Sequence, residues 1–362
     1  MGKMKKFFKN KKVIVTGHTG FKGSWLTTWL TMLGAKVLGV SKDLPYQPSL
    51  YNELKISKKI KDLRFDIKKL DKLKKTFQEF QPDFIFHLAA QPLVNISYTN
   101  PVNTWESNLI GTVNILESIK LIKKKCVCVI VTSDKCYRNY ETKKGYKESD
   151  ELGGYDPYSA SKGAAEIAVR SYIKSFYNNP GKYRIATARA GNVIGGGDWN
   201  VGRLIPDCIV SAQSKNIAKI RNKNSTRPWQ HVMELIYGYL KLSIELKKNS
   251  SLHGESFNFG PNKQKNRKVK EILNEIKKQW NFFRWKEVKK IKPDKKESNL
   301  LKLNCEKAHK KLKWRIVLSF KEVIKLTLDW YKLYYNKKNP KKNIYRFTIS
   351  QIDYYQKKIL NR

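Results

Sequence analysis

Acidic residues are scarce in this chain of 362 residues: 30 Asp and Glu stand against 74 Lys and Arg, which leaves a formal net charge of +44. Such a balance suggests an acidic partner such as nucleic acid. Arginine is scarce as well, because only 13 of the 74 cations are Arg, the residue that phosphate and base recognition favours. The lysines are scattered along the whole chain. We therefore expect a solvated, lysine-rich surface whose field attracts an anionic small substrate, and no nucleic-acid partner.

Cysteines are few, and long apolar runs are absent. The five cysteines are an odd number without C-x-x-C spacing, which argues against a disulfide framework and a structural zinc site. No apolar stretch approaches the roughly 20 residues that span a bilayer. The basic residues 1–10 are not followed by the apolar core of a signal peptide. These absences predict a cytoplasmic protein in a reducing compartment, with no metal and no membrane contact.

The chain has ample material for a core, with 40% hydrophobic residues. Apolar spacing predicts strands at 13–15, 36–40, 83–87, 127–132 and 185–189, and helices at 21–33, 70–80, 102–122 and 158–177. Strands with continuous apolar runs that alternate with helices indicate a parallel sheet covered on both faces. We expect an α/β fold, a doubly wound Rossmann sheet, with a smaller C-terminal α/β lobe from the lysine- and tryptophan-containing remainder.

Three glycines, Gly17, Gly20 and Gly23, follow the first strand and open the first helix. Glycines at this place let the backbone approach a pyrophosphate, which the N–H groups of the helix N-terminus then bind. Asp43 comes 20 residues after Gly23, near the end of the second strand, where a carboxylate binds the ribose hydroxyls of NAD. The sequence therefore predicts a dinucleotide site.

A tyrosine and a lysine, Tyr158 and Lys162, are four residues apart on a predicted helix, so their side chains lie on one face. Together with a nicotinamide cation, the ammonium of Lys162 is expected to lower the pKa of Tyr158 and make the phenol a base. The strand that precedes this helix ends in Thr132 and Ser133. We expect Thr132 to orient the substrate oxygen beside that base.

Taken together, these features resemble the extended short-chain dehydrogenase/reductase family, in its sugar-nucleotide epimerase and dehydratase branch. The resemblance covers about residues 11–355. Four longer motifs resemble the CDP-glucose 4,6-dehydratases within that branch, namely those at 132–137, 154–159, 189–199 and 227–232.

The resemblance implies a redox-neutral dehydration of CDP-glucose that uses NAD. Tyr158 would take the proton of the glucose 4-hydroxyl, Thr132 would hold that oxygen, and Lys162 would support the phenolate. Relatives carry an Asp-Glu pair for the elimination of water, where this chain has Asp134 and Lys135. Asp134 would protonate the leaving 6-hydroxyl and Lys135 would take H5. A lysine acts as a base only when neutral, which burial beside Lys162 would favour.

The resemblance also implies the binding residues and the assembly. The glycine loop, the strand ends and the reactive helix would bind NAD, through Gly17, His18, Thr19, Gly20, Phe21, Lys22, Gly23, Asp43, Asp66, Ile67, Leu88, Ala89, Ala90, Gln91, Asn108, Thr132, Tyr158, Lys162 and Ala190. The nucleotide sugar would lie against Ser133, Asn192, Arg203, Leu204, Pro206 and Arg227. Residues 1–190, with a returning segment at about 232–256, would form the NAD-binding domain, and residues 191–231 and 257–362 the substrate lobe. The helices at 102–122 and 158–177 would join two copies in a homodimer.

Three other functions stay open. A dehydratase of the same kind could act on another nucleotide hexose. A 4-epimerase of the same fold would oxidise C4 and return the hydride to the other face, and it would not need Asp134 and Lys135. A nucleic-acid-binding protein on a Rossmann fold would use the charge of +44, and it predicts basic residues clustered on one face. The intact Tyr158 and Lys162 favour an enzyme.

Overall fold

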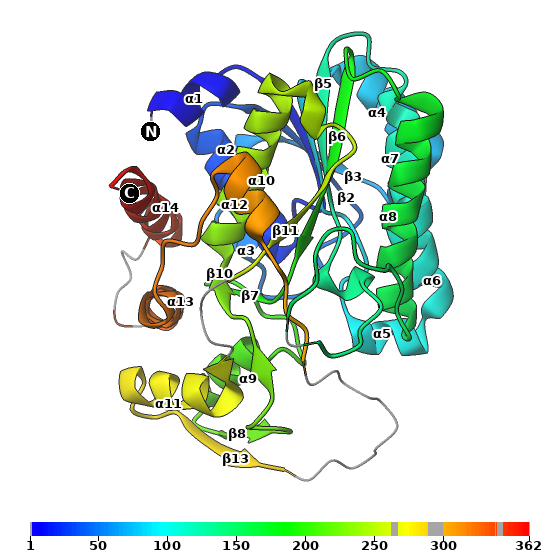
Figure 1. The fold of residues 1–362 in the computed structure, drawn as a ribbon. Coiled ribbons are helices and arrows are strands. Elements are labelled where there is room, and N and C mark those ends of the chain that lie inside the picture. Colours follow the sequence, from blue (N-terminus) through cyan, green and yellow to red (C-terminus); the bar gives the residue numbers. More distant parts are fainter. Residues whose placement is uncertain are drawn as a thin grey trace.

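The structure is a computed structural model that describes residues 2–142, 144–261, 267–288, 300–336, 338 and 343–361. A seven-stranded parallel sheet lies at its centre, in the order β11-β6-β5-β4-β1-β2-β3 (Figure 1). The strands are β1 (Lys12–Thr16), β2 (Lys36–Ser41), β3 (Lys61–Arg64), β4 (Phe84–His87), β5 (Cys126–Val131), β6 (Tyr183–Ala190) and β11 (Ser256–Phe259). The order reverses between β1 and β4, which is where such sheets bind ligands. The predicted doubly wound fold is confirmed.

Helices cover both faces of this sheet, because successive strand residues point to opposite sides. Val13 and Val15 pack with Trp25 on one face, whereas Ile14 between them packs with Phe77 on the other. The first face carries α2 (Phe21–Met32) and α10 (Val232–Lys248). The second carries α4 (Leu70–Phe80), α5 (Val94–Thr99), α6 (Pro101–Trp105), α7 (Gly111–Ile119) and α8 (Pro157–Phe176). Burial on both sides explains why the strands are apolar without alternation.

Two elements differ from the sequence prediction. The helix expected at 102–122 is divided by a π-helical segment, η2 (Glu106–Ile110), between α6 and α7. The edge strand β3 was not expected, because its sequence Lys-Asp-Leu-Arg has no apolar run. It pairs only with β2, and charged residues are common on such edges.

A smaller lobe lies beyond the carboxyl ends of the strands (Figure 1). Its α9 and α11 accompany a parallel pair of strands, β8 with β13, as the predicted second α/β unit requires. The elements of this part are β7 (Val193–Ile194), α9 (Leu204–Gln213), β8 (Ile217–Ile220), β9 (Thr226–Arg227), β10 (Gln230–His231), β12 (Arg267–Lys268), α11 (Val269–Gln279) and β13 (Arg284–Glu287). The following helix, α12 (Glu306–Leu312), instead contacts β11 and α10 of the Rossmann half (Figure 1). The exact boundary between two domains stays a prediction.

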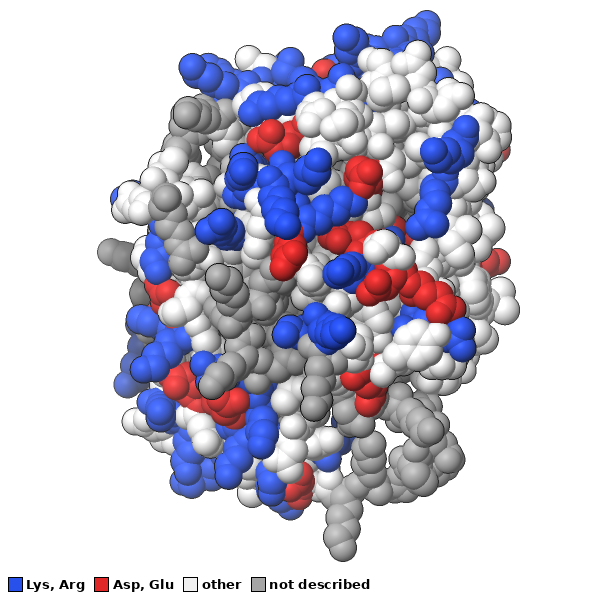
Figure 2. Space-filling view, in the orientation of Figure 1, with Lys and Arg blue, Asp and Glu red and all other residues white. Residues whose placement is uncertain are grey.

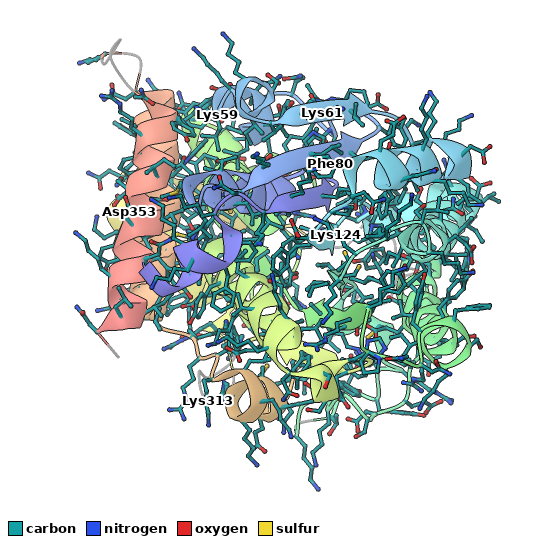
Figure 3. The ribbon with its side chains drawn as sticks, turned by 90° about the horizontal axis from the view of Figure 1, so that it is seen from above. Lys59, Lys61, Phe80, Lys124, Lys313 and Asp353 are labelled. Carbon is teal, nitrogen blue, oxygen red and sulfur yellow. The ribbon has the colours of Figure 1, made fainter. Side chains whose placement is uncertain are left out.

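The last helices are α13 (Phe320–Tyr335), which contacts α11 of the lobe, and α14 (Ile344–Leu360). The ring of Tyr355 meets Trp29 of α2 edge-on, with centroids 5.8 Å apart, so α14 packs on the Rossmann half. Viewed from above, α14 with Asp353 borders one side of the molecule (Figure 3). Tyr355 of α14 packs against aromatic rings of α2 and α10 in this half. The linker expected at 336–342 falls mostly outside the described residues.

Five short helical segments lie among the connections, namely α1 (Gly2–Phe8), α3 (Leu50–Glu53) and the 3-10 turns η1 (Ile56–Lys59), η3 (Asp134–Cys136) and η4 (Ser250–Leu252). All five cysteines are free and buried. Within the described residues, no helix is long and apolar enough to cross a membrane.

A buried carboxylate fastens the C-terminal segment to the Rossmann half. Glu234 of α10 is fully buried, and its Oε1 accepts hydrogen bonds from the backbone N–H groups of Val317 at 2.9 Å and Leu318 at 2.7 Å. Its Oε2 accepts one from the hydroxyl of Tyr355 at 2.6 Å. Three donors from two distant segments therefore depend on one side chain.

We predict that Glu234→Ala lowers the free energy of unfolding by about 3 kcal/mol or more, because buried donors lose a charged acceptor. Glu245→Ala on the same helix is the control, because Glu245 only pairs with the partly exposed Lys241 and Lys248. That change should cost less than about 1 kcal/mol. Urea denaturation followed by circular dichroism measures both, and equal losses would show that Glu234 is no anchor.

Candidate active site

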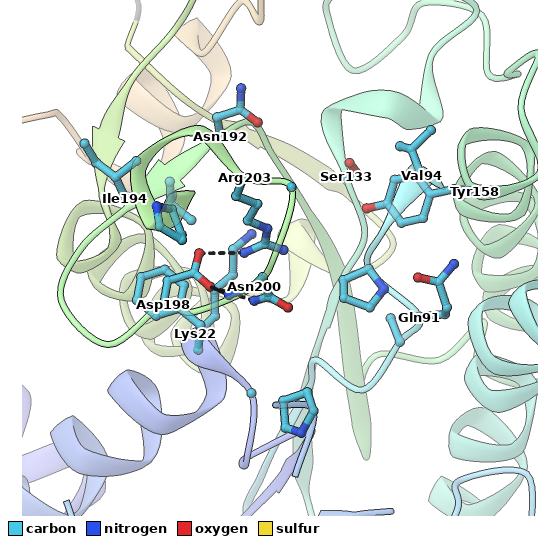
Figure 4. A pocket seen from close by; sticks show the side chains of 18 of the residues that line it. Lys22, Gln91, Val94, Ser133, Tyr158, Asn192, Ile194, Asp198, Asn200 and Arg203 are labelled. Atoms are coloured by element: carbon cyan, nitrogen blue, oxygen red, sulfur yellow. Dashed lines mark hydrogen bonds and ion pairs between the residues drawn. The ribbon is translucent and has the colours of Figure 1, made fainter. Parts of the chain in front are cut away.

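A cavity of about 660 Å³ opens at the carboxyl ends of β1, β4, β5 and β6. It lies at the reversal of strand order, and the small lobe closes its other side (Figures 1 and 4). Most of the residues predicted to react or bind line this one cavity, namely Gly17, Thr19, Gly20, Phe21, Lys22, Gly23, Asp43, Asp66, Ile67, Leu88, Ala89, Ala90, Gln91, Thr132, Ser133, Asp134, Lys135, Tyr158, Lys162, Ala190, Asn192, Arg203, Leu204 and Pro206.

The glycine loop has the shape that a dinucleotide phosphate needs. Gly17 has φ +75°, and a Cβ there would come within 2.7 Å of the backbone nitrogen of Ala89. A Cβ on Gly23 would lie 2.0 Å from the carbonyl oxygen of Gly17, so both positions require glycine. Gly20 caps α2 without any side-chain hydrogen bond, which leaves the N–H groups of the first turn to a ligand. The loop therefore fits a bound pyrophosphate.

Two residues predicted to bind the cofactor do not line the cavity. The ring of His18 is buried and hydrogen-bonded to Asp62 Oδ1 at 2.8 Å and Ser41 Oγ at 3.0 Å, so it fixes the loop from behind. Asn108 sits on the π-helical segment, where its Oδ1 accepts from the N–H of Gln91 at 2.8 Å. Its Nδ2 donates to Ser161 Oγ at 2.9 Å. Both side chains hold loops of the site in place. The prediction that they contact the cofactor directly is therefore corrected.

Tyr158 and Lys162 lie buried on α8, in adjacent turns, facing the cavity. Burial raises the pKa of Tyr158 to about 12, although hydrogen bonding by Ser133 lowers it in part. Burial also lowers the pKa of Lys162 to about 8, and the cation of Lys22 acts in the same direction. The predicted lowering of the Tyr158 pKa by Lys162 together with a nicotinamide cation stays a prediction, because desolvation dominates both groups in the protein alone.

The hydroxyl beside Tyr158 belongs to Ser133 and not to Thr132. Thr132 Oγ1 donates a hydrogen bond of 2.5 Å to the buried Oε1 of Glu166, which turns it away from the reacting side. Ser133, the next residue of an extended segment, faces the opposite way, toward Tyr158 (Figure 4). The predicted role of Thr132 is therefore corrected. Thr132 and Ser133 are adjacent residues that both carry a hydroxyl, so the sequence alone could not tell which one faces Tyr158.

Glu166 is a residue that the sequence analysis missed. It lies on α8 one turn after Lys162, fully within the core, and its Oε2 forms an ion pair of 2.8 Å with Arg189 of β6. Burial disfavours its charge, but Arg189 and the hydroxyls of Thr132 and Thr187 lower the pKa of Glu166 below its usual value. The spacing of four residues from Lys162 was a possible signal, since it places Glu166 on the same helix face.

The acid and base expected for the elimination follow Ser133 directly. Asp134 is buried, accepts a hydrogen bond from Ser133 Oγ at 3.1 Å, and lies so near Gly191 that a Cβ there would be 3.0 Å from its Oδ2. Lys135 lines the same cavity but is only half-buried, so it is less desolvated than expected. The structure brings both side chains to the cavity that holds Tyr158.

On the lobe side, Arg203 reaches the cavity and forms an ion pair of 2.9 Å with Asp198. Asp198 lies within the sequence motif at 189–199, and no function was predicted for it. The side chain of Arg227 falls outside the described residues, although its backbone forms β9. Within the described residues, no group of three or more His, Cys, Asp or Glu could hold a metal ion.

Comparison with known proteins agrees with this geometry. Residues 14–327 match the family model for GDP-mannose 4,6 dehydratase. The chain is 41% identical over 334 residues to the CDP-glucose 4,6-dehydratase of Salmonella typhimurium, which covers 91% of this chain and 92% of that one. It is 27% identical to the human dTDP-D-glucose 4,6-dehydratase, over 94% of this chain and 95% of the relative. A solved dTDP-glucose 4,6-dehydratase from Bacillus anthracis, in complex with NAD, shares the fold with a TM-score of 0.74 at 21% identity, over 91% of this chain and 98% of the other.

The lowered pKa of Lys162 predicts a pH-dependent stability. Between pH 8 and about 10.5 the unfolded chain binds a proton that the folded protein has lost, so this group makes stability rise with pH in that interval. At pH 7 its burial as a cation costs stability. Lys162→Met should therefore raise the free energy of unfolding at pH 7 by about 2 kcal/mol, and the gain should shrink toward pH 10.

Denaturant titrations at several pH values measure this difference. Lys174→Met, an exposed position on the same helix, is the control and should change stability by less than about 0.5 kcal/mol at every pH. A gain for Lys162→Met that grows with pH would contradict the assignment.

Proposed function

The chain belongs to the GDP-mannose 4,6-dehydratase family, and we propose that within this family it is an NAD-dependent CDP-glucose 4,6-dehydratase, a hydro-lyase. The observation that carries the proposal is one cavity that unites a Tyr-Lys pair, an Asp-Lys pair and a glycine loop. A 4-epimerase needs the first pair only. The 41% identity to a CDP-glucose 4,6-dehydratase supports CDP-glucose as the substrate.

The residues present fit NAD. The glycine loop and the uncapped start of α2 would bind the pyrophosphate, and Asp43, exposed at the cavity mouth after β2, would bind a ribose. When bound, NAD supplies the hydride acceptor for C4, the later hydride donor for C6, and a positive charge beside the phenol.

In the first step Tyr158 takes the proton of the glucose 4-hydroxyl while C4 loses its hydride. Ser133 holds that oxygen, in the place predicted for Thr132, and Lys162 stabilises the phenolate from the next turn of α8. Because the pKa of Tyr158 is about 12 in the protein alone, this base becomes effective only in the loaded site.

The new 4-keto group acidifies H5, which allows water to leave across C5 and C6. Lys135, in its neutral form, takes H5 as a proton, and Asp134, in its protonated form, gives its proton to the 6-hydroxyl, which departs as water. Hydride return to C6 and a proton at C5 then yield CDP-4-dehydro-6-deoxyglucose, which serves deoxysugar and O-antigen synthesis.

We also propose a cytoplasmic homodimer. Apolar side chains are exposed on neighbouring helices of one flank, from α6 to α8, at Val102, Ile110, Ile167 and Phe176. Such an apolar face is typical of a subunit interface. The free, buried cysteines suit a reducing compartment.

The charge distribution does not favour the nucleic-acid alternative. On the face seen in Figure 2, Lys and Arg are interspersed with Asp and Glu and do not form one stripe. Of the lysines labelled in Figure 3, Lys59 and Lys61 are close in the sequence, whereas Lys124 and Lys313 lie in other parts of the molecule.

Incubation with NAD and, separately, CDP-, dTDP-, GDP- and UDP-linked hexoses tests the substrate. We expect the product of CDP-glucose alone to be lighter by one water, as measured by mass spectrometry. Loss of water from another nucleotide sugar would contradict the CDP assignment, and an epimer of unchanged mass would contradict the roles of Asp134 and Lys135.

Substitution of the two neighbouring hydroxyls tests which one serves the reaction. Ser133→Ala should lower kcat about 100-fold, because the 4-oxygen loses its partner. Thr132→Val should keep kcat within a few-fold and lower stability by about 1–3 kcal/mol, because Glu166 loses a buried donor. The opposite pattern in kcat and thermal melting would restore the role to Thr132.

A further inference from the structure

The loop between β7 and α9 brings a buried acid next to a cation of the cavity. Asp198 Oδ2 lies 2.9 Å from Arg203 Nη1, and the two side chains differ in exposure, at 4% for Asp198 and 32% for Arg203. Figure 4 shows the pair on the lobe side of the cavity, joined by dashed lines that also reach Asn200. The acid is thus the fixed partner, and the guanidinium is the partner that a ligand can reach.

Every polar group of Asp198 is used to fix it. Its Oδ1 accepts hydrogen bonds from the N–H of Asn200 at 3.2 Å and from Asn200 Nδ2 at 2.6 Å. Its backbone N–H donates to the hydroxyl of Tyr331 at 2.9 Å, and its carbonyl accepts from that same hydroxyl at 2.5 Å. Tyr331 belongs to the long helix α13, so the carboxylate is anchored to an element outside the loop.

The loop around Asp198 is also packed closely. A Cβ on Gly196 would lie 2.0 Å from the ring of Trp330, and the carbonyl of Gly196 accepts from Trp25 Nε1 at 3.0 Å. Trp199 Nε1 donates to the hydroxyl of Tyr335 at 3.0 Å. Helices α2 and α13 therefore hold both sides of the loop, which gives Asp198 one position.

Arg203 keeps most of its hydrogen-bonding capacity for a ligand. A guanidinium has five N–H donors in a planar fork, and among the described residues the ion pair with Asp198 engages Nη1 alone. The charge of Arg203 influences both Tyr158 and Lys22, so it lies near the reacting centre. A free arginine loses much rotamer entropy when it binds a phosphate, and a carboxylate that holds one edge of the fork removes that cost in advance.

We propose that Asp198 is a positioning residue, which holds the Arg203 guanidinium in the orientation that binds the diphosphate of the nucleotide sugar. The inference rests on the proposed function for the identity of the ligand. A purely structural role for the ion pair makes a different prediction. Loss of such a pair would lower the stability of the protein and leave its ligand affinity unchanged.

Asp198→Asn tests the inference in the full chain loaded with NAD. Calorimetry with CDP, dTDP, GDP and UDP, each as the free nucleoside diphosphate, gives Kd, and turnover of the active nucleotide sugar gives KM and kcat. We expect Kd for the bound diphosphate and KM to rise about tenfold, with kcat changed less than about twofold. Asp83→Asn is the control, because Asp83 pairs with Lys124 at 2.8 Å away from the cavity, and it should leave Kd and KM unchanged.

The double variant separates positioning from a general effect. Arg203→Lys keeps the charge and loses the fork, so Asp198→Asn added to it should raise Kd no further. Where Asp198→Asn does not fold, Asp198→Glu, which moves the carboxylate by one methylene, takes its place with the same expectation. Unchanged Kd in a variant with lowered melting temperature would overturn the inference, as would additive losses in the double variant. A wild-type protein that binds none of the four diphosphates would also overturn it. Wild-type binding of a diphosphate without turnover of CDP-glucose would contradict the proposed function alone.

Discussion

The buried carboxylate of Glu166 sets the geometry on which the active site depends. It joins α8 to three neighbouring strands, through Thr132 after β5, Arg189 of β6 and Ser256 of β11. A charge in the core is stable only when it is paired and fully hydrogen-bonded, so this interaction fixes how α8 lies along the sheet. The base Tyr158 and its partner Lys162 stand on the preceding turns of that helix. Their position relative to Ser133 therefore follows from an interaction behind the cavity.

The cavity itself is governed by charge in a desolvated space. Lys22, Lys162 and Arg203 approach one another there, with Asp134 and Asp198 as the opposing acids. Burial lowers the pKa of both lysines to about 8, so the protein bears a cost that anionic ligands relieve. The charge that matters for function is this small buried set. The net charge of +44 belongs mainly to a dispersed lysine surface.

Local patterns predicted much of this structure, and distant partners account for what they did not. The doubly wound sheet, the glycine loop and the Tyr158-Lys162 pair follow from spacing within a strand or a helix. Which of the hydroxyls of Thr132 and Ser133 faces Tyr158 depends on Glu166, more than 30 residues later, because Glu166 accepts the hydrogen bond of Thr132. The position of Asp198 depends on a hydrogen bond to Tyr331, 133 residues away. Helix α14 lies on α2 because the ring of Tyr355 packs against Trp29. No short window of sequence contains both partners of such contacts.

In the proposed reaction, one cavity oxidises C4, eliminates water and returns the same hydride to C6. Turnover of CDP-glucose that carries deuterium at C4, with NAD-loaded protein and NMR analysis of the product, follows that hydride. We expect the deuterium at C6 of a 4-keto-6-deoxy sugar, with no net accumulation of NADH. Deuterium retained at C4 of an epimer, or lost to the solvent, would contradict it.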